Sequence, residues 1–414
     1  MQSGTRGAGP GWRTPAVVVA AGCLIALIGF GVRSTYGLFT GPLSEANGWG
    51  RDVFALALAL QNLLWGMAQP FAGAVADRYG PSRVLAAGGL LYGAGVALTA
   101  FSDTPLLIQL TAGVMVGVGL AGASFTVVIA AFGRMMPPEK RSWAAGIATA
   151  SGSMGQFLFA PLGSAFIAAY GWQSALVLLG VCMMGVPLLA TALAGGAKGR
   201  AAGSSAAVPD LTTGQALRQA FGHGSYLLLV AGFFVCGFHV AFITVHLPPY
   251  LADIGAPPSL AGWAIALIGL FNIVGSYSAG MLGTRMPKRY ILSVIYALRA
   301  LAIAVFIAVP VSAASVLVFS AAMGLLWLST VPPTSGLVER MFGVRHLGML
   351  FGIAFFSHQV GSFLGVWLGG VFYERTGSYD MIWWAGIALG IFAAIVHWPI
   401  VEKPAPTVLQ PSRA

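Results

Sequence analysis

The sequence predicts an all-α membrane protein with twelve transmembrane helices, arranged as two pseudo-symmetric halves of six. Three observations support this prediction: a shortage of charged residues, a series of long apolar segments, and a repeat that relates the two halves. Of the 414 residues, 57% are hydrophobic and only 8% are charged, whereas a soluble globular protein carries about 25% charged residues. The mean hydropathy is +0.84. Because so little polar surface is available to face water, we expect a lipid bilayer to surround most of the chain.

The apolar segments have the length that a bilayer requires. A helix needs roughly 20 predominantly apolar residues to cross the hydrocarbon core. Twelve segments meet this requirement, at about 15–40, 52–76, 84–101, 105–133, 143–169, 172–194, 226–250, 259–283, 289–310, 312–338, 347–373 and 379–400.

The segment between the sixth and seventh spans differs in composition. Residues 195–225 are rich in Gly, Ala and Ser, which predicts a flexible cytoplasmic linker. Within it, 210–221 is expected to form a short helix that lies at the membrane interface. The chain is therefore expected to consist of an N-terminal half over 1–194, the linker, a C-terminal half over 226–400, and a cytoplasmic tail over 401–414.

The distribution of basic residues predicts the orientation of the spans. When the N-terminus is placed inside, 17 of the 21 Lys and Arg residues fall in inner segments and only two in outer ones. The positive-inside rule therefore places both termini on the cytoplasmic side of an inner membrane. This bias also accounts for the net charge of +10. Nucleic acid is not an expected partner, because the basic residues are spread over many loops with no stacking aromatic residues between them.

Two arginines, Arg33 and Arg299, lie near the middle of apolar spans, whereas all 11 acidic residues fall in loops or at helix ends. A cation at the bilayer centre costs about 2.5–3.5 kcal/mol on insertion scales and is usually functional. A guanidinium binds a carboxylate through two parallel hydrogen bonds. We therefore expect Arg33 to bind an anionic substrate, with Tyr36 one turn away on the same face. Arg299 is expected either to contact substrate or to have a structural role.

An internal repeat relates the two halves. At a constant offset of 206 residues, glycines and an arginine coincide over a whole helix, in the pairs Arg134/Arg340, Gly146/Gly352, Gly155/Gly361, Gly163/Gly369 and Gly171/Gly377. Parallel halves of this kind are related by an axis along the membrane normal, with the transport site at their interface. The same offset pairs Arg33 with His239, which predicts that these two residues lie at similar depth.

Further polar residues within the spans are candidates for the same site. His246 lies seven residues after His239, on the same helical face. Asn272 belongs to the eighth span, and His358 and Gln359 belong to the eleventh. Each is expected either to contact substrate or to form a hydrogen bond between packed helices.

The stretch "GAVADRYGPSR", residues 73–83, resembles the loop between helices 2 and 3 of the major facilitator superfamily. A degenerate copy, "GMLGTRMPKR", follows the eighth span and has Thr284 where the aspartate would be. The resemblance implies the major facilitator fold and a cytoplasmic gate. The gating residues that it implies are Gly73, Asp77, Arg78, Gly80 and Arg83 in the first copy and Arg285 in the second.

Within that superfamily, the first half resembles the monocarboxylate porters and their bacterial organic-anion relatives. The similarity is carried by "GVRSTYGLF", which contains Arg33, and by "RSWAAGIATASGSMGQFLFAPLGSAFIAAYGW" in the fifth span. The chain departs from the animal members in the eighth span, where Asn272 and Ser276 stand at the positions of their Asp and Arg. This departure argues against proton symport of the lactate type through that pair.

The sequence excludes several other functions. It contains no P-loop and no recognisable catalytic motif, and its three cysteines have no metal-binding spacing. We therefore expect no enzyme activity, no catalytic residue, no metal and no cofactor. The predicted function is secondary transport of a small organic anion, a monocarboxylate, by alternating access, as a monomer, through proton symport or anion exchange. The alternatives are an exporter of hydrophobic or drug-like compounds and a transporter-like sensor.

Overall fold

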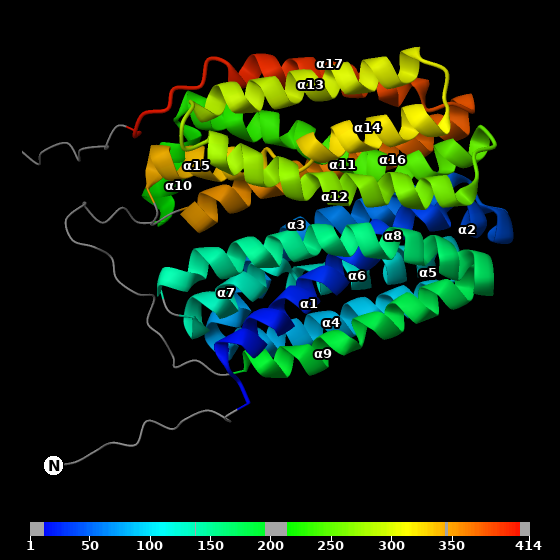
Figure 1. Ribbon diagram of the computed structural model, residues 1–414, viewed down its shortest axis with the longest axis horizontal. Helices are drawn as coiled ribbons and strands as arrows, with labels where there is room; N and C mark the ends of the chain where they lie inside the picture. The colour runs from blue at the N-terminus through cyan, green and yellow to red at the C-terminus, as the bar shows by residue number, and fades with distance from the viewer. Residues whose placement is uncertain (1–11, 137, 195–212, 344–346, 406–414) are drawn as a thin grey trace, which may run out of the picture. The chain divides into compact units, whose positions relative to one another are not determined.

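The computed structural model describes residues 12–136, 138–194, 213–343 and 347–405 (Figure 1). The described residues form helices joined by short connections, and none of them forms a strand. This confirms the all-α prediction. Their contacts divide the chain into two compact units, one formed by Met1–Ala202 with Thr244–Leu270 and the other by Gly203–Ile243 with Phe271–Ala414.

The first unit contains the helices of the expected N-terminal half. They are α1 (Pro15–Ser34), the 3₁₀ helix Tyr36–Phe39, α2 (Thr40–Asn47), α3 (Arg51–Tyr79), α4 (Pro81–Thr99), α5 (Pro105–Ile108), the π-helix Gln109–Met115, α6 (Val116–Gly122), α7 (Phe125–Met135), α8 (Pro138–Met183), α9 (Gly185–Ala190) and the 3₁₀ helix Thr191–Leu193.

Two long helices are shared between the units. They are α11 (Gly224–Asp253) and α12 (Pro258–Leu282), whose residues 244–270 belong to the first unit. Within that unit Asp253 accepts two hydrogen bonds from the guanidinium of Arg51, at 2.7 and 2.5 Å. The compact units therefore do not follow the expected division into 1–194 and 226–400, and that division stays a prediction.

The second unit contains the remaining helices. They are α10 (Thr213–Phe221), α13 (Lys288–Ala308), α14 (Ala313–Leu326), α15 (Val331–Phe342), α16 (Leu347–Thr376) and α17 (Asp380–His397). Helix α10 lies in the segment for which a short interfacial helix is expected. Residues 195–212 of the expected linker lie outside the described residues.

Among the described residues, eleven helical elements are long and apolar enough to cross a membrane. The expected fifth and sixth spans fall within one 51-residue element, Trp143–Leu193. Inside it Gly171 has a φ of 79°, which interrupts the helix. Because only glycine adopts this conformation readily, the chain can turn there and form two spans from one continuous run. The expected repeat partner, Gly377, also has a positive φ, of 69°.

Glycines bring the main helices of each unit into close contact. In the first unit a Cβ on Gly31 of α1 would lie 3.0 Å from the carbonyl oxygen of Gly155 of α8. In the second, a Cβ on Gly365 of α16 would lie 2.6 Å from the carbonyl oxygen of Phe238 of α11. Small residues allow such backbone approach where no hydrophobic effect drives helices together in lipid. In the repeat, the pair Gly155 and Gly361 serves the same packing within each unit, because a Cβ on either would collide with a backbone carbonyl of the facing helix.

The expected tenth span is broken. Helix α14 ends at Leu326 and α15 begins only at Val331, so four residues leave the helical hydrogen-bond ladder in the middle of the 30-residue apolar element Ala313–Phe342. Within a membrane, such freed backbone groups need partners from side chains of neighbouring helices. Two polar residues singled out from the sequence, Asn272 and Arg299, supply them.

Candidate functional site

Arg33 lies in the last turn of α1, near the middle of the 33-residue membrane element Pro15–Asn47. Its Nη2 donates to Oδ1 of Asn62 on α3 at 2.6 Å. Its Cζ lies 4.9 Å from the centre of the Trp65 ring, also on α3. This places the cation over an aromatic face, where the ring quadrupole attracts it.

The charge of Arg33 has no counter-ion in the described part of the chain. The described ion pairs join Arg51 to Asp253 and Arg134 to Asp77. Asn62, the one hydrogen-bond partner of Arg33, is neutral, and Nε of Arg33 is buried without a partner among the described residues. A guanidinium has five donors, so most of its donor capacity is uncommitted.

The groups around Arg33 have hydrogen-bond partners of their own. Asn62 donates to the carbonyl of Leu58 at 2.8 Å, and Trp65 donates its indole N–H to Oε1 of Gln69 at 3.0 Å. Gln69 in turn donates to the hydroxyl groups of Ser124 and Thr126, at 3.1 and 2.6 Å. These two separate sets of hydrogen bonds hold Asn62 and Trp65 in place, so that the face they present to Arg33 is preorganised.

Tyr36 lies three residues after Arg33, in the 3₁₀ helix that follows α1. Its ring is 2% exposed and stacks on Phe54 of α3, with a centroid distance of 6.3 Å. Its hydroxyl has no hydrogen-bond partner among the described residues. A buried hydroxyl without a partner is costly. The first unit thus holds a cation and a hydroxyl, both with free donors, on neighbouring turns.

The histidines predicted for the site belong to α11 and α16. His239 is in the second unit, where a ring nitrogen is 2.7 Å from the carbonyl oxygen of Gly386 on α17. His246, on the same helix, is fully buried in the first unit. His358 contacts Oε1 of its neighbour Gln359 at 3.1 Å and packs 5.0 Å from the ring of Phe233. His239 and His358 therefore both have packing partners within their own unit.

Asn272 and Arg299 meet at the break between α14 and α15. Oδ1 of Asn272 accepts the backbone N–H of Leu328 at 2.9 Å. Arg299 is fully buried and donates to the carbonyl oxygens of Leu326, at 2.6 and 3.1 Å, and of Trp327. The break was not foreseen from the sequence, and it explains why two polar residues lie opposite this part of the tenth span.

Four of the residues implied as a gate, Asp77, Arg78, Gly80 and Arg83, lie where α3 ends and α4 begins. Asp77 accepts from Nη2 of Arg134 on α7 at 2.7 Å, and its side chain is 76% exposed. Gly80 has a φ of 95°, which ends α3 and starts α4. The exposed Arg78 lies over the ring of Tyr79 at 5.3 Å. The structure therefore brings Asp77 together with a basic residue that the motif itself does not contain.

The other implied gate residues are exposed or lack near neighbours. Arg83 and Arg285 are exposed, and a Cβ on Gly73 would meet no neighbour within 4 Å. Sequence reasoning also missed Trp65 as part of the Arg33 site. Its spacing of three residues from Asn62 was the available signal, because residues three apart share a helical face.

Comparisons with known proteins agree with this architecture. The family model described as Major Facilitator Superfamily matches residues 19–325 and 229–414. The uncharacterized MFS-type transporter YcxA of Bacillus subtilis (strain 168) is 26% identical over 379 residues, which are 90% of this chain and 91% of that protein. Monocarboxylate transporter 13 of Rattus norvegicus is 26% identical over 382 residues, which are 90% of this chain and 84% of that protein.

The same architecture occurs among solved structures. A bacterial homologue of the human lysosomal transporter Spinster, in an inward-facing and occupied conformation, aligns with a TM-score of 0.74 over 94% of this chain and 97% of that one. At 15% sequence identity, this likeness shows the fold alone.

Proposed function

The chain belongs to the Major Facilitator Superfamily, and we propose that it is a secondary transporter of a small organic anion, a monocarboxylate, that works by alternating access. The family match makes it a multi-pass membrane transporter. The observation that supports an anionic substrate is Arg33, a guanidinium in the middle of a membrane span whose described partners are an amide and an indole ring.

The chemistry of Arg33 favours a carboxylate. An uncompensated charge away from water is unstable, and a carboxylate would supply both the counter-charge and two parallel hydrogen bonds. Trp65 covers one face of the guanidinium and Asn62 occupies one donor. The remaining donors suit one carboxylate group, and the Tyr36 hydroxyl can donate to the same anion. A single cation in this site favours a monocarboxylate over a dicarboxylate.

The similarity to monocarboxylate transporter 13 supports the same substrate class, since it covers 90% of this chain. Transport of a singly charged anion is electroneutral when a proton accompanies it or another anion replaces it. We propose one of these two modes. The protonated group, in a symport, would be a histidine or the carboxyl group of the substrate, because the acidic residues lie outside the apolar interior of the spans.

A binding experiment tests the anion site. The melting temperature of the purified protein would be measured with monocarboxylates, dicarboxylates, neutral amides and organic cations, for the native chain and for Arg33→Gln. A ligand at 100 times its Kd stabilises the folded state by about 2.7 kcal/mol. We expect monocarboxylates to raise the melting temperature of the native chain only. Arg375→Gln, at the far end of α16, serves as the matched control and should keep the response.

A ligand response that does not depend on Arg33 would favour the exporter alternative. If cations or neutral compounds stabilised the native chain and Arg33→Gln equally, the arginine would be structural and the protein would be better described as an exporter of hydrophobic compounds. Transport into proteoliposomes distinguishes proton symport from anion exchange. Proton symport requires uptake to increase with an inward proton gradient, whereas exchange requires a second anion inside.

A further inference from the structure

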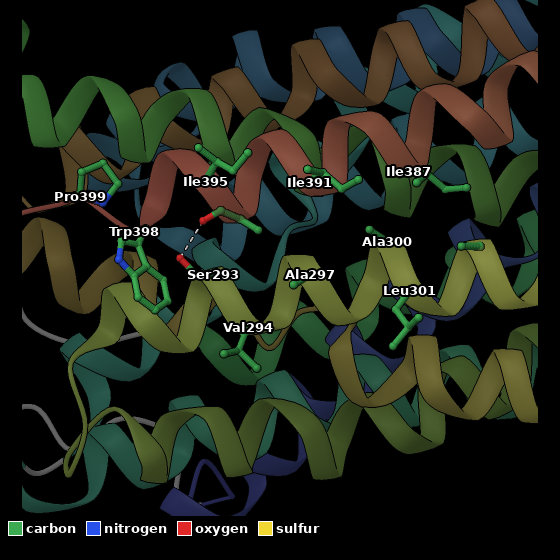
Figure 2. Close-up of a pocket in the computed structure, with 12 residues that line it drawn as sticks. Ser293, Val294, Ala297, Ala300, Leu301, Ile387, Ile391, Ile395, Trp398 and Pro399 are labelled. Atoms are coloured by element: carbon green, nitrogen blue, oxygen red, sulfur yellow. Dashed lines mark hydrogen bonds between the residues drawn. The ribbon is translucent and has the colours of Figure 1, made fainter.

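A groove of about 820 Å³ runs between α13 and α17 of the second unit (Figure 2). Both helices are long and apolar enough to cross a membrane. Its floor is made of small side chains, including Ala297 and Ala300 of α13. The exposed side chains of Leu301 on α13 and of Ile391 and Ile395 on α17 rise beside this floor.

Along the two helices the wall of the groove offers no free polar group, and the indole N–H of Trp398 lies only at one end. Ser293 is its one hydroxyl-bearing residue, and this hydroxyl donates to the carbonyl of Ala394 at 2.8 Å (Figure 2). A substrate with polar groups would therefore find no partner along the groove. A flexible hydrocarbon chain would fill it, because the van der Waals contacts missing above the alanines are what such a chain supplies.

One end of the groove differs from the rest. Trp398 and Pro399 line it there, and the Trp398 ring lies 4.8 Å from the ring of Tyr290 at the start of α13. Trp and Tyr are enriched where a membrane protein meets the headgroup region. This aromatic pair therefore marks the level at which a lipid in the groove would change from acyl chain to headgroup.

Arg289 lies at this same end. Its guanidinium donates to the carbonyl of Ile400, at 3.1 Å, and to the hydroxyl of Tyr290, at 2.8 Å. Three of its five donors have no protein acceptor in the described part of the chain. The nearby carboxylate of Glu402 accepts the main-chain N–H of Arg289, at 2.8 Å, and forms no ion pair with its side chain among the described residues. The free charge complements an anionic headgroup.

We propose that this groove is a binding site for an anionic phospholipid, with one acyl chain on the alanine floor and the phosphate at Arg289. A second copy of the chain fits less well, because the walls of Leu301, Ile391 and Ile395 would keep the backbone of a partner helix away from the alanines. A phosphatidylcholine fits the groove but carries no net negative charge for Arg289. The charge at the end of the groove therefore sets the headgroup preference.

Native mass spectrometry of the full chain would test this site with phosphatidylglycerol and phosphatidylcholine of identical acyl chains. We expect phosphatidylglycerol to bind more tightly. Ala297→Phe, which fills the groove, should abolish this difference, and Arg289→Gln should weaken binding of phosphatidylglycerol about five-fold, as expected for one basic residue near a membrane surface. Arg289→Lys keeps the charge and should retain most of the preference.

Two control variants separate the groove from general effects. Val274→Phe adds the same ring to a lipid-exposed position of α12 outside the groove, and Arg375→Gln removes a cation from the other end of the spans; both should bind lipid like the native chain. Equal binding of the two lipids, or a phosphatidylglycerol preference that survives Ala297→Phe, would refute the proposal. A dimer that Ala297→Phe converts to a monomer would also overturn it and would assign the groove to a second copy.

Discussion

Two arginines within apolar spans, Arg33 and Arg299, have different hydrogen-bond partners. Arg299 is fully buried and its donors reach the carbonyl oxygens of Leu326 and Trp327. Arg33 has one neutral partner, Asn62, and keeps most of its donors free. An arginine whose hydrogen bonds go to backbone carbonyls stabilises the fold, whereas one with most of its donors uncommitted is available to a ligand. The two residues should therefore separate cleanly in experiments.

Arg299→Met is expected to lower stability and to leave anion binding intact. The substitution keeps much of the side-chain volume but leaves the carbonyls at the end of α14 without donors, at a cost of about 1–3 kcal/mol for a buried unsatisfied group. Thermal unfolding without ligand measures the loss. Loss of the anion response at an unchanged melting temperature would instead place Arg299 in the binding site.

Tyr36→Phe is expected to have opposite effects on stability and on binding. The Tyr36 hydroxyl is buried without a described partner, so its removal should leave the melting temperature unchanged or raise it. A hydrogen bond to a charged group contributes about 1.5–3 kcal/mol, so anion affinity should fall about ten-fold or more. Titration calorimetry gives the affinity. An unchanged affinity would exclude the hydroxyl from the site.

At the scale of helices, close packing depends on individual glycines. A Cβ on Gly155 of α8 would collide with the carbonyl of Leu27 on α1, whereas a Cβ on Gly152, one turn earlier, would make an ordinary contact with Phe30 at 3.4 Å. Both positions are glycines of α8, and they differ in how closely the backbone of α1 approaches them. They therefore form a matched pair.

Gly155→Ala is expected to destabilise the protein, and Gly152→Ala is not. Overpacking costs about 1–3 kcal/mol, and the carbonyl of Leu27 belongs to a helix and cannot rotate away as a side chain could. Gly152→Ala should be neutral or slightly stabilising, since alanine favours helix over glycine. Melting temperatures in one detergent decide the matter, and equal effects would show that α1 and α8 separate easily.

The contact between α3 and α7 makes a different prediction. The pair formed by Asp77 and Arg134 is largely exposed, with side chains 76% and 25% accessible, and exposed ion pairs contribute about 0–1 kcal/mol. Asp77→Asn should therefore leave the melting temperature unchanged. If the pair is part of a gate, the transport rate should still fall, while affinity for the anion is kept. Unchanged transport would make the contact an ordinary surface pair.

For the whole molecule, the distribution of basic residues predicts that both termini are cytoplasmic. Single cysteines at Lys403 and Arg375 would test this in a chain whose Cys23, Cys182 and Cys236 are replaced by Ser. An impermeant thiol reagent should label position 375 in intact cells and position 403 only after the membrane is inverted. Labelling of both positions from the same side would refute the predicted orientation.

Much of the architecture could be predicted from the sequence, because lipid imposes a simple rule. Each span must be apolar over a length set by the bilayer, so the segments, the loop motif at Asp77 and the unusual position of Arg33 are all visible in the order of residues. The repeat is visible for the same reason. Its paired glycines at 171 and 377 stand where the backbone takes a positive φ. Those features depend on local sequence alone.

The partners of the polar side chains were decided by tertiary structure. Three of the site candidates, His239, Asn272 and His358, contact Gly386, Leu328 and Gln359, and their role in substrate binding stays a prediction. Within lipid, a polar side chain forms its hydrogen bond with the group that the fold places next to it. That group often belongs to a distant part of the chain. By itself, therefore, the sequence determined the membrane fold, the family and the presence of an unneutralised cation. Only the packing of helices decided that Arg299 donates to the backbone carbonyls of Leu326 and Trp327, while the one described hydrogen bond of Arg33 goes to the side chain of Asn62.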